Sequence, residues 1–246
     1  MVKTLCCLIV LLAFSVLMTL NSSSRVIEAQ TNGETIAIID TGNVGSTLGK
    51  IWAANGHTII YVSRAPQSER VQQLVSDIGN GATATTQAEA AAQGNIILIP
   101  IPPTAIPEVM SALGDLSGKL IIDPTNWWTF ENDWATAPRD PRDSLAEQVQ
   151  ALAPNAVVVK AFNTMNFAVM VDPTISDGPV TAPIAGDNAA AKARVAALVE
   201  DVGLEPLDVG PLAAAEYLEE MLRLAIGFRE INPGMAFDYH LRLRPN

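Results

Sequence analysis

The sequence predicts an α/β fold with a doubly wound, mainly parallel sheet and a short C-terminal helical appendage. Short β-branched runs alternate with segments of helical periodicity from Thr35 onward, as in βα units. Several of these runs are apolar throughout, which is typical of strands covered on both faces. A glycine-containing polar turn joins the first run directly to the first helical segment.

Six runs are predicted to be strands because each is short and rich in isoleucine, valine or threonine. They are Ile36–Ile39, Thr58–Val62, Ala82–Thr85, Ile96–Ile99, Leu120–Ile122 and Val157–Val159. An edge strand is expected near Thr181–Ala185, and a short apolar run, Pro206–Val209, follows later.

Apolar residues at helical spacing lie between and after these runs and predict amphipathic helices. The stripes are Val44, Leu48, Ile51 and Trp52; Val71, Leu74, Val75 and Ile78; Ile106, Val109, Met110 and Leu113; Leu145, Val149 and Leu152; Val195, Leu198, Val199 and Val202; and Tyr217, Met221, Leu224, Ala225 and Phe228. The longest irregular stretch is Trp127–Pro141, which holds three tryptophans.

The first 29 residues have the pattern of a signal peptide or an N-terminal anchor. Lys3 precedes an apolar run from Leu5 to Leu20, and a polar stretch follows it. The run is short for a membrane-spanning helix, which needs about 20 residues, so cleavage is favoured over an uncleaved anchor. We therefore expect a protein that is exported, periplasmic or extracellular, or one that is held at a membrane only through this segment.

Composition excludes several classes of function. The chain has 15 Lys and Arg against 26 Asp and Glu, a formal net charge of −11, so nucleic acid is not an expected partner. The cysteines are Cys6 and Cys7 and the histidines are His57 and His240, so we expect no disulfide, thiolate catalysis, cysteine-ligated zinc or multi-histidine metal site in the body. We expect a small-molecule redox partner, and we leave a homodimer open.

The turn after the first strand has the composition of a phosphate-binding loop. It is Asp40-Thr41-Gly42-Asn43-Val44-Gly45, and a helix begins at once. Glycine lets the backbone approach a diphosphate, and a helix N-terminus offers free N–H groups. Asp40 occupies the first glycine position of the usual G-x-G-x-x-G pattern, where a carboxylate opposes a diphosphate. The order of strand, loop, helix and second strand favours a Rossmann-type dinucleotide site over an ordinary turn.

Two polar residues follow the second strand, where nucleotide specificity is set. NAD sites place an acid here, about 20 residues after the loop, to bind the ribose 2′-hydroxyl. This chain has Ser63 and Arg64, which can donate to a 2′-phosphate instead. The sequence therefore favours NADP over NAD, the alternative being a solvated arginine. His57 lies in the turn before this strand and is expected to be structural.

Five segments give the chain a resemblance to the coenzyme F-420-dependent NADP oxidoreductases, whose Rossmann domain is also similar to the N-terminal part of ferric reductases of the STEAP type. The segments are Thr41-Gly42-Asn43-Val44-Gly45, Ser63-Arg64, Asp123-Pro124-Thr125-Asn126, Val159-Lys160-Ala161-Phe162-Asn163-Thr164, and Ala185-Gly186-Asp187 through Asp208-Val209-Gly210-Pro211 with Ala215, Tyr217 and Leu218. The fourth segment is the most specific of them.

This resemblance implies NADP(H) at the carboxyl ends of the strands and direct hydride transfer to or from a stacked deazaflavin. The cofactor-binding residues that it implies are Thr41, Gly42, Asn43, Val44, Gly45, Ser63, Arg64, Ile101, Thr125 and Ala161. It also implies an NADP-binding Rossmann domain over residues 30–210, followed by a C-terminal helix and tail over residues 211–246.

Three positions depart from the family pattern. They are Asp40, Ser68, where a lysine often holds the 2′-phosphate, and Trp127, where a proline commonly follows Asn126. Arg70 is our candidate to replace that lysine.

Hydride transfer between two rings depends on apposition and orientation, and the sequence indicates no firm catalytic residue. Asn126, Asn163 and Thr164 are candidates to orient the reacting edge, with loop capping as the alternative. Lys160 is expected either to meet a phosphate or a carboxylate, or to extend from the strand end into solvent. Trp127 and the next residue, also a tryptophan, would either stack on the acceptor or plug the space between loop and sheet.

Two functions compete at this point. The first is an NADP-dependent oxidoreductase that transfers a hydride between NADP(H) and a deazaflavin (F-420) or flavin-type acceptor. The second is a non-catalytic NADP-binding redox sensor or subunit, which Asp40 and the export signal favour. An imine or hydroxy-acid reductase is disfavoured because too few residues follow Val209 to form its large helical domain.

Overall fold

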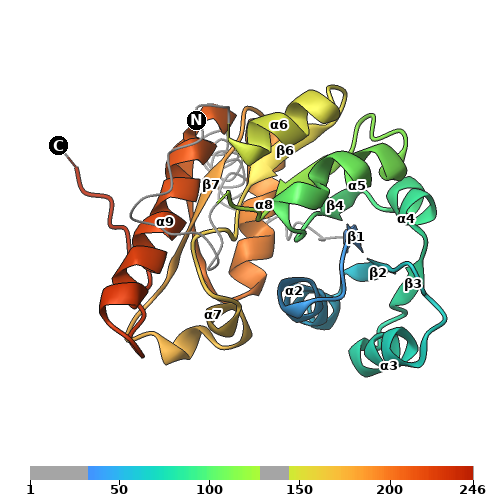
Figure 1. Ribbon diagram of the computed structural model, residues 1–246, viewed down its shortest axis with the longest axis horizontal. Helices are drawn as coiled ribbons and strands as arrows, with labels where there is room; N and C mark the ends of the chain where they lie inside the picture. Colours follow the sequence, from blue (N-terminus) through green and yellow to red (C-terminus); the bar gives the residue numbers. More distant parts are fainter. Residues whose placement is uncertain (1–32, 128–143, 246) are drawn as a thin grey trace, which may run out of the picture. The chain divides into compact units, whose positions relative to one another are not determined.

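The computed structural model describes residues 33–127 and 144–245. These residues contain an eight-stranded sheet of order β3-β2-β1-β4-β5-β6-β7-β8 (Figure 1). The strands are β1 (Thr35–Ile38), β2 (Thr58–Val62), β3 (Thr83–Thr85), β4 (Ile96–Leu98), β5 (Leu120–Asp123), β6 (Val157–Lys160), β7 (Thr181–Ala185) and β8 (Glu205–Gly210). The expected mainly parallel sheet is confirmed.

The helices follow the strands in the alternation that βα units require. They are α2 (Asn43–Ala54), α3 (Glu69–Ile78), α4 (Gln87–Gln93), α5 (Ile106–Leu113), α6 (Leu145–Leu152), α7 (Phe167–Val171), α8 (Ala189–Asp201) and α9 (Ala215–Ile231), with short 3-10 turns at Pro103–Ala105, Pro173–Ile175 and Leu212–Ala214. The six predicted helices all form. Two short helices, α4 and α7, were not predicted, because α4 has no stripe of large apolar residues and the sequence of α7, Phe-Ala-Val-Met-Val, favours a strand.

Strand direction divides the sheet into two parts. The strands β1 to β6 pair in parallel, β7 is antiparallel to β6, and β8 is parallel to β7. The expectation of an edge strand near Thr181–Ala185 is wrong, because β7 lies between β6 and β8 and all five of its residues are buried. The edge position belongs to β8, which covers the outer side of β7.

Alternation along the parallel strands divides the core between the two faces of the sheet. In β1, Ile36 and Ile38 belong to one buried cluster and Ala37 belongs to the other. Residues of α2 and α8 pack in the first cluster, and residues of α4, α5 and α6 pack in the second. Helices on both faces make the sheet doubly wound, as predicted, and leave the carboxyl ends of its strands to form a site.

The helix α9 forms where predicted, but its buried face was predicted wrongly. Tyr217 and Leu224, two members of the predicted stripe, are 64% and 62% exposed. The buried side chains include Ala215, Leu218 and Ile226, together with the charged residue Glu219. Apolar spacing identified the helix, but contacts with β6 and α6 selected a different face.

Part of the predicted organisation falls outside the described residues. This applies to the N-terminal segment 1–29, to both cysteines, and to most of the Trp127–Pro141 stretch, including Trp128. Within residues 33–127 and 144–245, no helix is long and apolar enough to cross a membrane. The same residues contain no group of three or more His, Cys, Asp or Glu side chains that could hold a metal ion.

Candidate functional site

The turn between β1 and α2 presents a helix N-terminus without a side-chain cap. Gly42 is the N-cap residue, so no N-cap side chain accepts a hydrogen bond from the N–H groups of the first turn. The first turn of this 12-residue helix also contains no acidic residue. The leading N–H groups of α2 therefore remain available to an anionic ligand, as the loop sequence predicted.

The loop glycines allow close packing around this helix N-terminus. A Cβ atom on Gly45 would lie 2.9 Å from the Asp40 carbonyl oxygen and 2.9 Å from Ile38 Cγ2. The Tyr61 hydroxyl donates to the Gly45 carbonyl oxygen at 3.2 Å. Gly45 therefore brings α2 against β1 and β2, which is the packing role of the last glycine in a dinucleotide fold.

The carboxylate of Asp40 lies against the same loop. A Cβ atom on Gly42 would be 2.5 Å from Asp40 Oδ2, so the carboxylate occupies the space beside this glycine. The described residues offer Asp40 no salt bridge that would neutralise its charge. A negative charge here opposes a bound phosphate. The replacement of the usual glycine by Asp40 therefore places an unfavourable charge at the loop in the folded protein.

One arginine of α3 contacts the phosphate loop, and another arginine follows β2. Ser63 and Arg64 directly follow the end of β2, and Arg64 is exposed. Arg70, in the first turn of α3, donates from Nη2 to Thr41 Oγ1 at 2.6 Å. The structure thus brings the Arg70 guanidinium to the phosphate loop, and its role in place of the missing lysine stays a prediction.

A cavity of about 810 Å³ lies beyond the carboxyl ends of β4, β5 and β6. Val44 of α2, Ile101 after β4 and Thr125 after β5 line it, so it adjoins the phosphate loop. The structure brings together at this cavity three of the implied cofactor residues, Val44, Ile101 and Thr125, and all three orienting candidates, Asn126, Asn163 and Thr164. Ala161 is fully buried and is not part of the cavity wall.

The turn after β6 leads from the buried end of the strand to the wall of the cavity. Phe162 has a φ of +65°, in the left-handed region that costs a non-glycine residue about 1–2 kcal/mol. Its ring packs edge-on against Trp52, with centroids 5.8 Å apart. This conformation turns the chain sharply between Lys160, which points inward, and Asn163, which lines the cavity.

Three buried polar atoms on the cavity wall have no hydrogen-bond partner among the described residues. They are Thr125 Oγ1, Asn163 Oδ1 and Thr164 Oγ1. Leaving a buried polar atom unpaired costs about 1–3 kcal/mol, so such atoms call for a ligand or a water. Two hydroxyls and one amide oxygen suit a group with both N–H donors and a carbonyl acceptor, such as a carboxamide. The donor set therefore fits the nicotinamide end of a dinucleotide.

Asn126 and Asn163 hydrogen-bond to each other and connect the loops that follow β5 and β6. One of their side-chain atoms remains without a hydrogen-bond partner among the described residues. Asn163 Nδ2 donates to Asn126 Oδ1 at 2.9 Å and to the Leu218 carbonyl oxygen at 2.8 Å. Asn126 Nδ2 donates to the Asn163 carbonyl oxygen at 3.1 Å. Because each nitrogen faces acceptors only, the amide orientations are determined and Asn163 Oδ1 is the atom left over. These contacts agree with the loop-capping alternative for Asn163, and its role in orienting a ligand stays a prediction.

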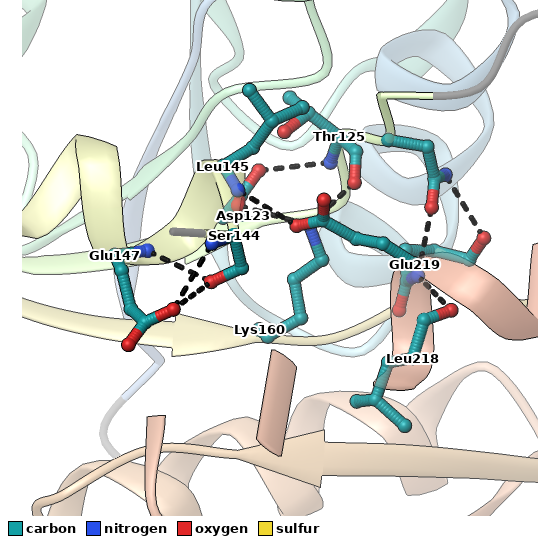
Figure 2. A network of polar contacts seen from close by, with 10 residues as sticks. Asp123, Thr125, Ser144, Leu145, Glu147, Lys160, Leu218 and Glu219 are labelled. Atoms are coloured by element: carbon teal, nitrogen blue, oxygen red, sulfur yellow. Dashed lines mark hydrogen bonds and ion pairs between the residues drawn. The ribbon is translucent and has the colours of Figure 1, made fainter. Parts of the chain in front are cut away.

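Lys160 lies inside the protein and pairs with two carboxylates (Figure 2). Its Nζ is 3.1 Å from Asp123 Oδ2 and 2.7 Å from Glu219 Oε1, and it also donates to the Thr125 carbonyl oxygen. The alternative that Lys160 extends into solvent is wrong, because the residue is 0% exposed. The alternative that it meets a carboxylate is confirmed, although both carboxylates belong to the protein.

Glu219 was not predicted as part of the site. It is 2% exposed, and burial raises its pKa although the nearby Lys160 ammonium lowers it in part. The sequence gives no signal that distinguishes it, because Glu219 is one of four glutamates in α9 and lies outside the apolar stripe predicted for that helix. Sequence pattern alone could not reveal that this acid faces the lysine of a strand 59 residues earlier.

An apolar part of the cavity wall comes from α7, α9 and the C-terminal tail. Phe167 and Met170 of α7, Ile226 of α9 and Phe237 of the C-terminal tail line it. The tail is held by edge-on packing of Phe237 between Phe228 and Tyr239, and the Tyr239 hydroxyl donates to the Met221 carbonyl oxygen at 2.6 Å. This wall can accept the face of a flat, largely apolar ligand.

Trp127 and His57 have contacts that favour structural roles. Trp127 packs with Ile101 against the core cluster of one sheet face and does not line the cavity, which favours the plug alternative for this residue. His57 Nδ1 accepts from the Glu34 backbone N–H, and its Nε2 is 2.9 Å from Asp201 Oδ2. His57 precedes the amino end of β2, at the edge of the sheet opposite to the cavity, in line with the structural role expected of it.

Comparison with known proteins indicates a dinucleotide-binding oxidoreductase family. Residues 35–127 match the family described as NADP oxidoreductase, coenzyme F420-dependent. Metalloreductase STEAP3 of Rattus norvegicus is 28% identical over 206 residues, which make up 83% of this chain and 40% of that protein. The chain therefore spans less than half the length of this curated relative.

Solved structures share the fold over most of the chain. A putative F420-dependent NADP-reductase from Arthrobacter sp. FB24 is 29% identical with a TM-score of 0.75, covering 86% of this chain and 100% of that one. A hypothetical protein, SMa0349 of Sinorhizobium meliloti, is 30% identical with a TM-score of 0.62, covering 74% and 88% of the two chains.

Proposed function

Because the chain belongs to the coenzyme F420-dependent NADP oxidoreductase family and contains its Rossmann-type NAD(P)-binding domain, we propose that it transfers a hydride between NADP(H) and a deazaflavin (F-420) or flavin-type acceptor. One observation carries this proposal furthest. A single cavity combines unpaired buried polar atoms, suited to a carboxamide, with an apolar wall suited to a second flat ring.

Each part of the site has a distinct task in this proposal. The N-terminus of α2 holds the diphosphate, and Ser63, Arg64 and Arg70 hold the 2′-phosphate. Thr125, Asn163 and Thr164 orient the carboxamide through their unpaired atoms. When bound, NADPH supplies the hydride.

The apolar wall defines the properties of the acceptor. Phe167, Met170 and Phe237 exclude water from the space beside the oriented ring, and Arg229 and Asp238 are the charged residues among those that line the cavity. Transfer between two apposed rings depends on their orientation, which the unpaired atoms on one side and the apolar wall on the other can provide. A deazaflavin or flavin ring matches this surface better than a small hydroxy acid does.

A non-catalytic NADP-binding sensor or subunit is the second candidate. The unneutralised carboxylate of Asp40 beside the phosphate loop favours it, because this charge weakens nucleotide binding. The export signal predicted from the sequence favours it as well, since NADPH is an intracellular reductant. A sensor needs NADP binding but no acceptor.

Titration of the full-length protein with NADPH and NADH, followed by stopped-flow absorbance with coenzyme F-420 and with FMN, tests both candidates. We expect tighter binding of NADPH than of NADH and reduction of at least one acceptor. Binding of NADPH without reduction of either acceptor would favour the sensor. Absence of nucleotide binding would overturn both candidates.

A further inference from the structure

Three charged residues form a buried cluster behind the wall of the cavity (Figure 2). Asp123 ends β5, Lys160 ends β6 and Glu219 lies in α9, and their exposed fractions are 0%, 0% and 2%. None of the three is among the residues that line the cavity. Any effect on a ligand must therefore pass through a neighbour.

That neighbour is Thr125. Its backbone N–H donates to Asp123 Oδ1 at 2.8 Å, and its carbonyl oxygen accepts from Lys160 Nζ. The cluster thus holds both backbone polar groups of Thr125, while Oγ1 stays unpaired on the cavity wall. The cluster therefore fixes the backbone of Thr125, a residue that lines the cavity and has an unpaired buried hydroxyl.

Glu219 connects the buried cluster to the helices α6 and α9. Its Oε1 accepts from Lys160 Nζ at 2.7 Å and from the Leu145 backbone N–H, at the start of α6, at 3.0 Å. The preceding residue, Leu218, accepts from Asn163 through its carbonyl oxygen, and Ile226, two turns further along α9, lines the apolar side of the cavity. One cluster therefore fixes the polar wall relative to the helix of the apolar wall.

Stability alone does not require such a cluster. Replacing a buried ion pair by apolar residues of similar volume is often neutral or stabilising, because removing the charges from water is costly. Neighbouring apolar contacts could hold β5, β6 and α9 together without charges. Holding the backbone N–H and carbonyl oxygen of Thr125, by contrast, requires an acceptor and a donor at fixed positions.

We propose that Asp123, Lys160 and Glu219 are positioning residues that hold Thr125 in place for the nicotinamide end of bound NADP(H). This inference rests on the proposed function, because it concerns how that site selects its ligand. The adenosine half of the nucleotide is bound elsewhere, by the loop, β2 and α3, and does not depend on the cluster.

The test compares two ligands on full-length protein. NADPH carries the nicotinamide, whereas 2′,5′-ADP has only the adenosine half with its 2′-phosphate. In Lys160→Met, we expect the dissociation constant of NADPH to rise about tenfold or more, while that of 2′,5′-ADP stays within about twofold. Lys119→Met is the matched control, because Lys119 donates to the Gly94 carbonyl oxygen at the amino end of β5, away from the cavity.

A second variant separates positioning from folding. Lys160→Met combined with Asp123→Asn and Glu219→Gln leaves no charge in the cluster, so its melting temperature should exceed that of Lys160→Met alone. The loss of NADPH affinity should persist in it, because the contact to the Thr125 carbonyl oxygen remains absent.

The outcomes distinguish this inference from the proposed function. A parallel loss of affinity for both ligands in the charge-free variant, or wild-type affinity for NADPH in it, would overturn the positioning role alone. If the wild-type protein binds neither NADPH nor 2′,5′-ADP, the proposed function fails first, and this inference fails with it.

Discussion

The two ends of the candidate site are built in different ways. The end assigned to the adenosine half consists of surface groups on separate segments, with Arg64 and Arg70 exposed and Asp40 beside the loop. The end assigned to nicotinamide consists of buried groups joined across β5, β6 and α9, with Lys160 at their centre. A change at the first end should therefore alter ligand affinity alone, whereas a change at the second should alter folding stability as well.

The largest effect is expected at the buried end. Lys160→Met leaves the carboxylates of Asp123 and Glu219 without their buried partner, and breaking a buried ion pair from one side costs about 3–5 kcal/mol. Urea denaturation should show this decrease in the free energy of unfolding. A loss below about 1 kcal/mol, as for a surface pair, would contradict the contrast between the two ends.

The next effect is expected at the exposed end. Arg64→Ala removes a guanidinium that we assign to the 2′-phosphate, so the dissociation constant of NADPH should rise about tenfold while that of NADH stays unchanged. Denaturation of this variant should match the wild type, because the side chain is exposed. Equal losses for NADPH and NADH would assign Arg64 to a different part of the nucleotide.

A smaller effect, again at the buried end, concerns pH. Burial raises the pKa of Glu219 in the folded protein above its ordinary value in the unfolded chain. The protonated form is therefore favoured by folding, and the stability that it contributes is complete below the ordinary pKa and is lost as the pH rises through the folded one. One such group changes stability by at most about 1.4 kcal/mol per pH unit.

Glu219→Gln cannot ionise and should flatten this part of the profile of unfolding free energy against pH. Glu220→Gln is the matched control, since the neighbouring Glu220 is more exposed and lies 3.6 Å from Arg223. Parallel wild-type and Glu219→Gln profiles above the ordinary pKa of a glutamate would show that Glu219 is ionised in the folded protein throughout.

The smallest effect is expected from Asp40. Asp40→Asn keeps the shape of the side chain beside Gly42 but removes its charge, so NADPH should bind about two- to fivefold more tightly. Because the effect is electrostatic, it should shrink when the titration is repeated at high salt. An unchanged affinity at low salt would show that the carboxylate does not oppose the phosphates.

The same contrast explains which parts of the site could be predicted from sequence. The phosphate loop, Ser63 and Arg64 are adjacent in sequence to the ends of β1 and β2, so the order of strand and helix was enough to place them. Glu219 meets Lys160 across 59 residues and Asn163 meets Leu218 across 55, and no local pattern specifies such pairs. The face of α9 was predicted wrongly for this reason, because Tyr217 and Leu224 had the helical spacing but not the tertiary contacts.

The sequence by itself determined the class of fold, the positions of the six parallel strands along the chain and the position of the phosphate loop. Local periodicity and the placement of glycines encode these features, and both can be recognised within a short segment of the sequence. Only the tertiary structure decided that β7 lies inside the sheet and that Lys160 is buried between two carboxylates. It also decided that residues of α9 and the C-terminal tail line the cavity. These features depend on which distant segments pack against one another. The hydrophobic effect that drives this packing is non-directional, so the local sequence does not specify the partners.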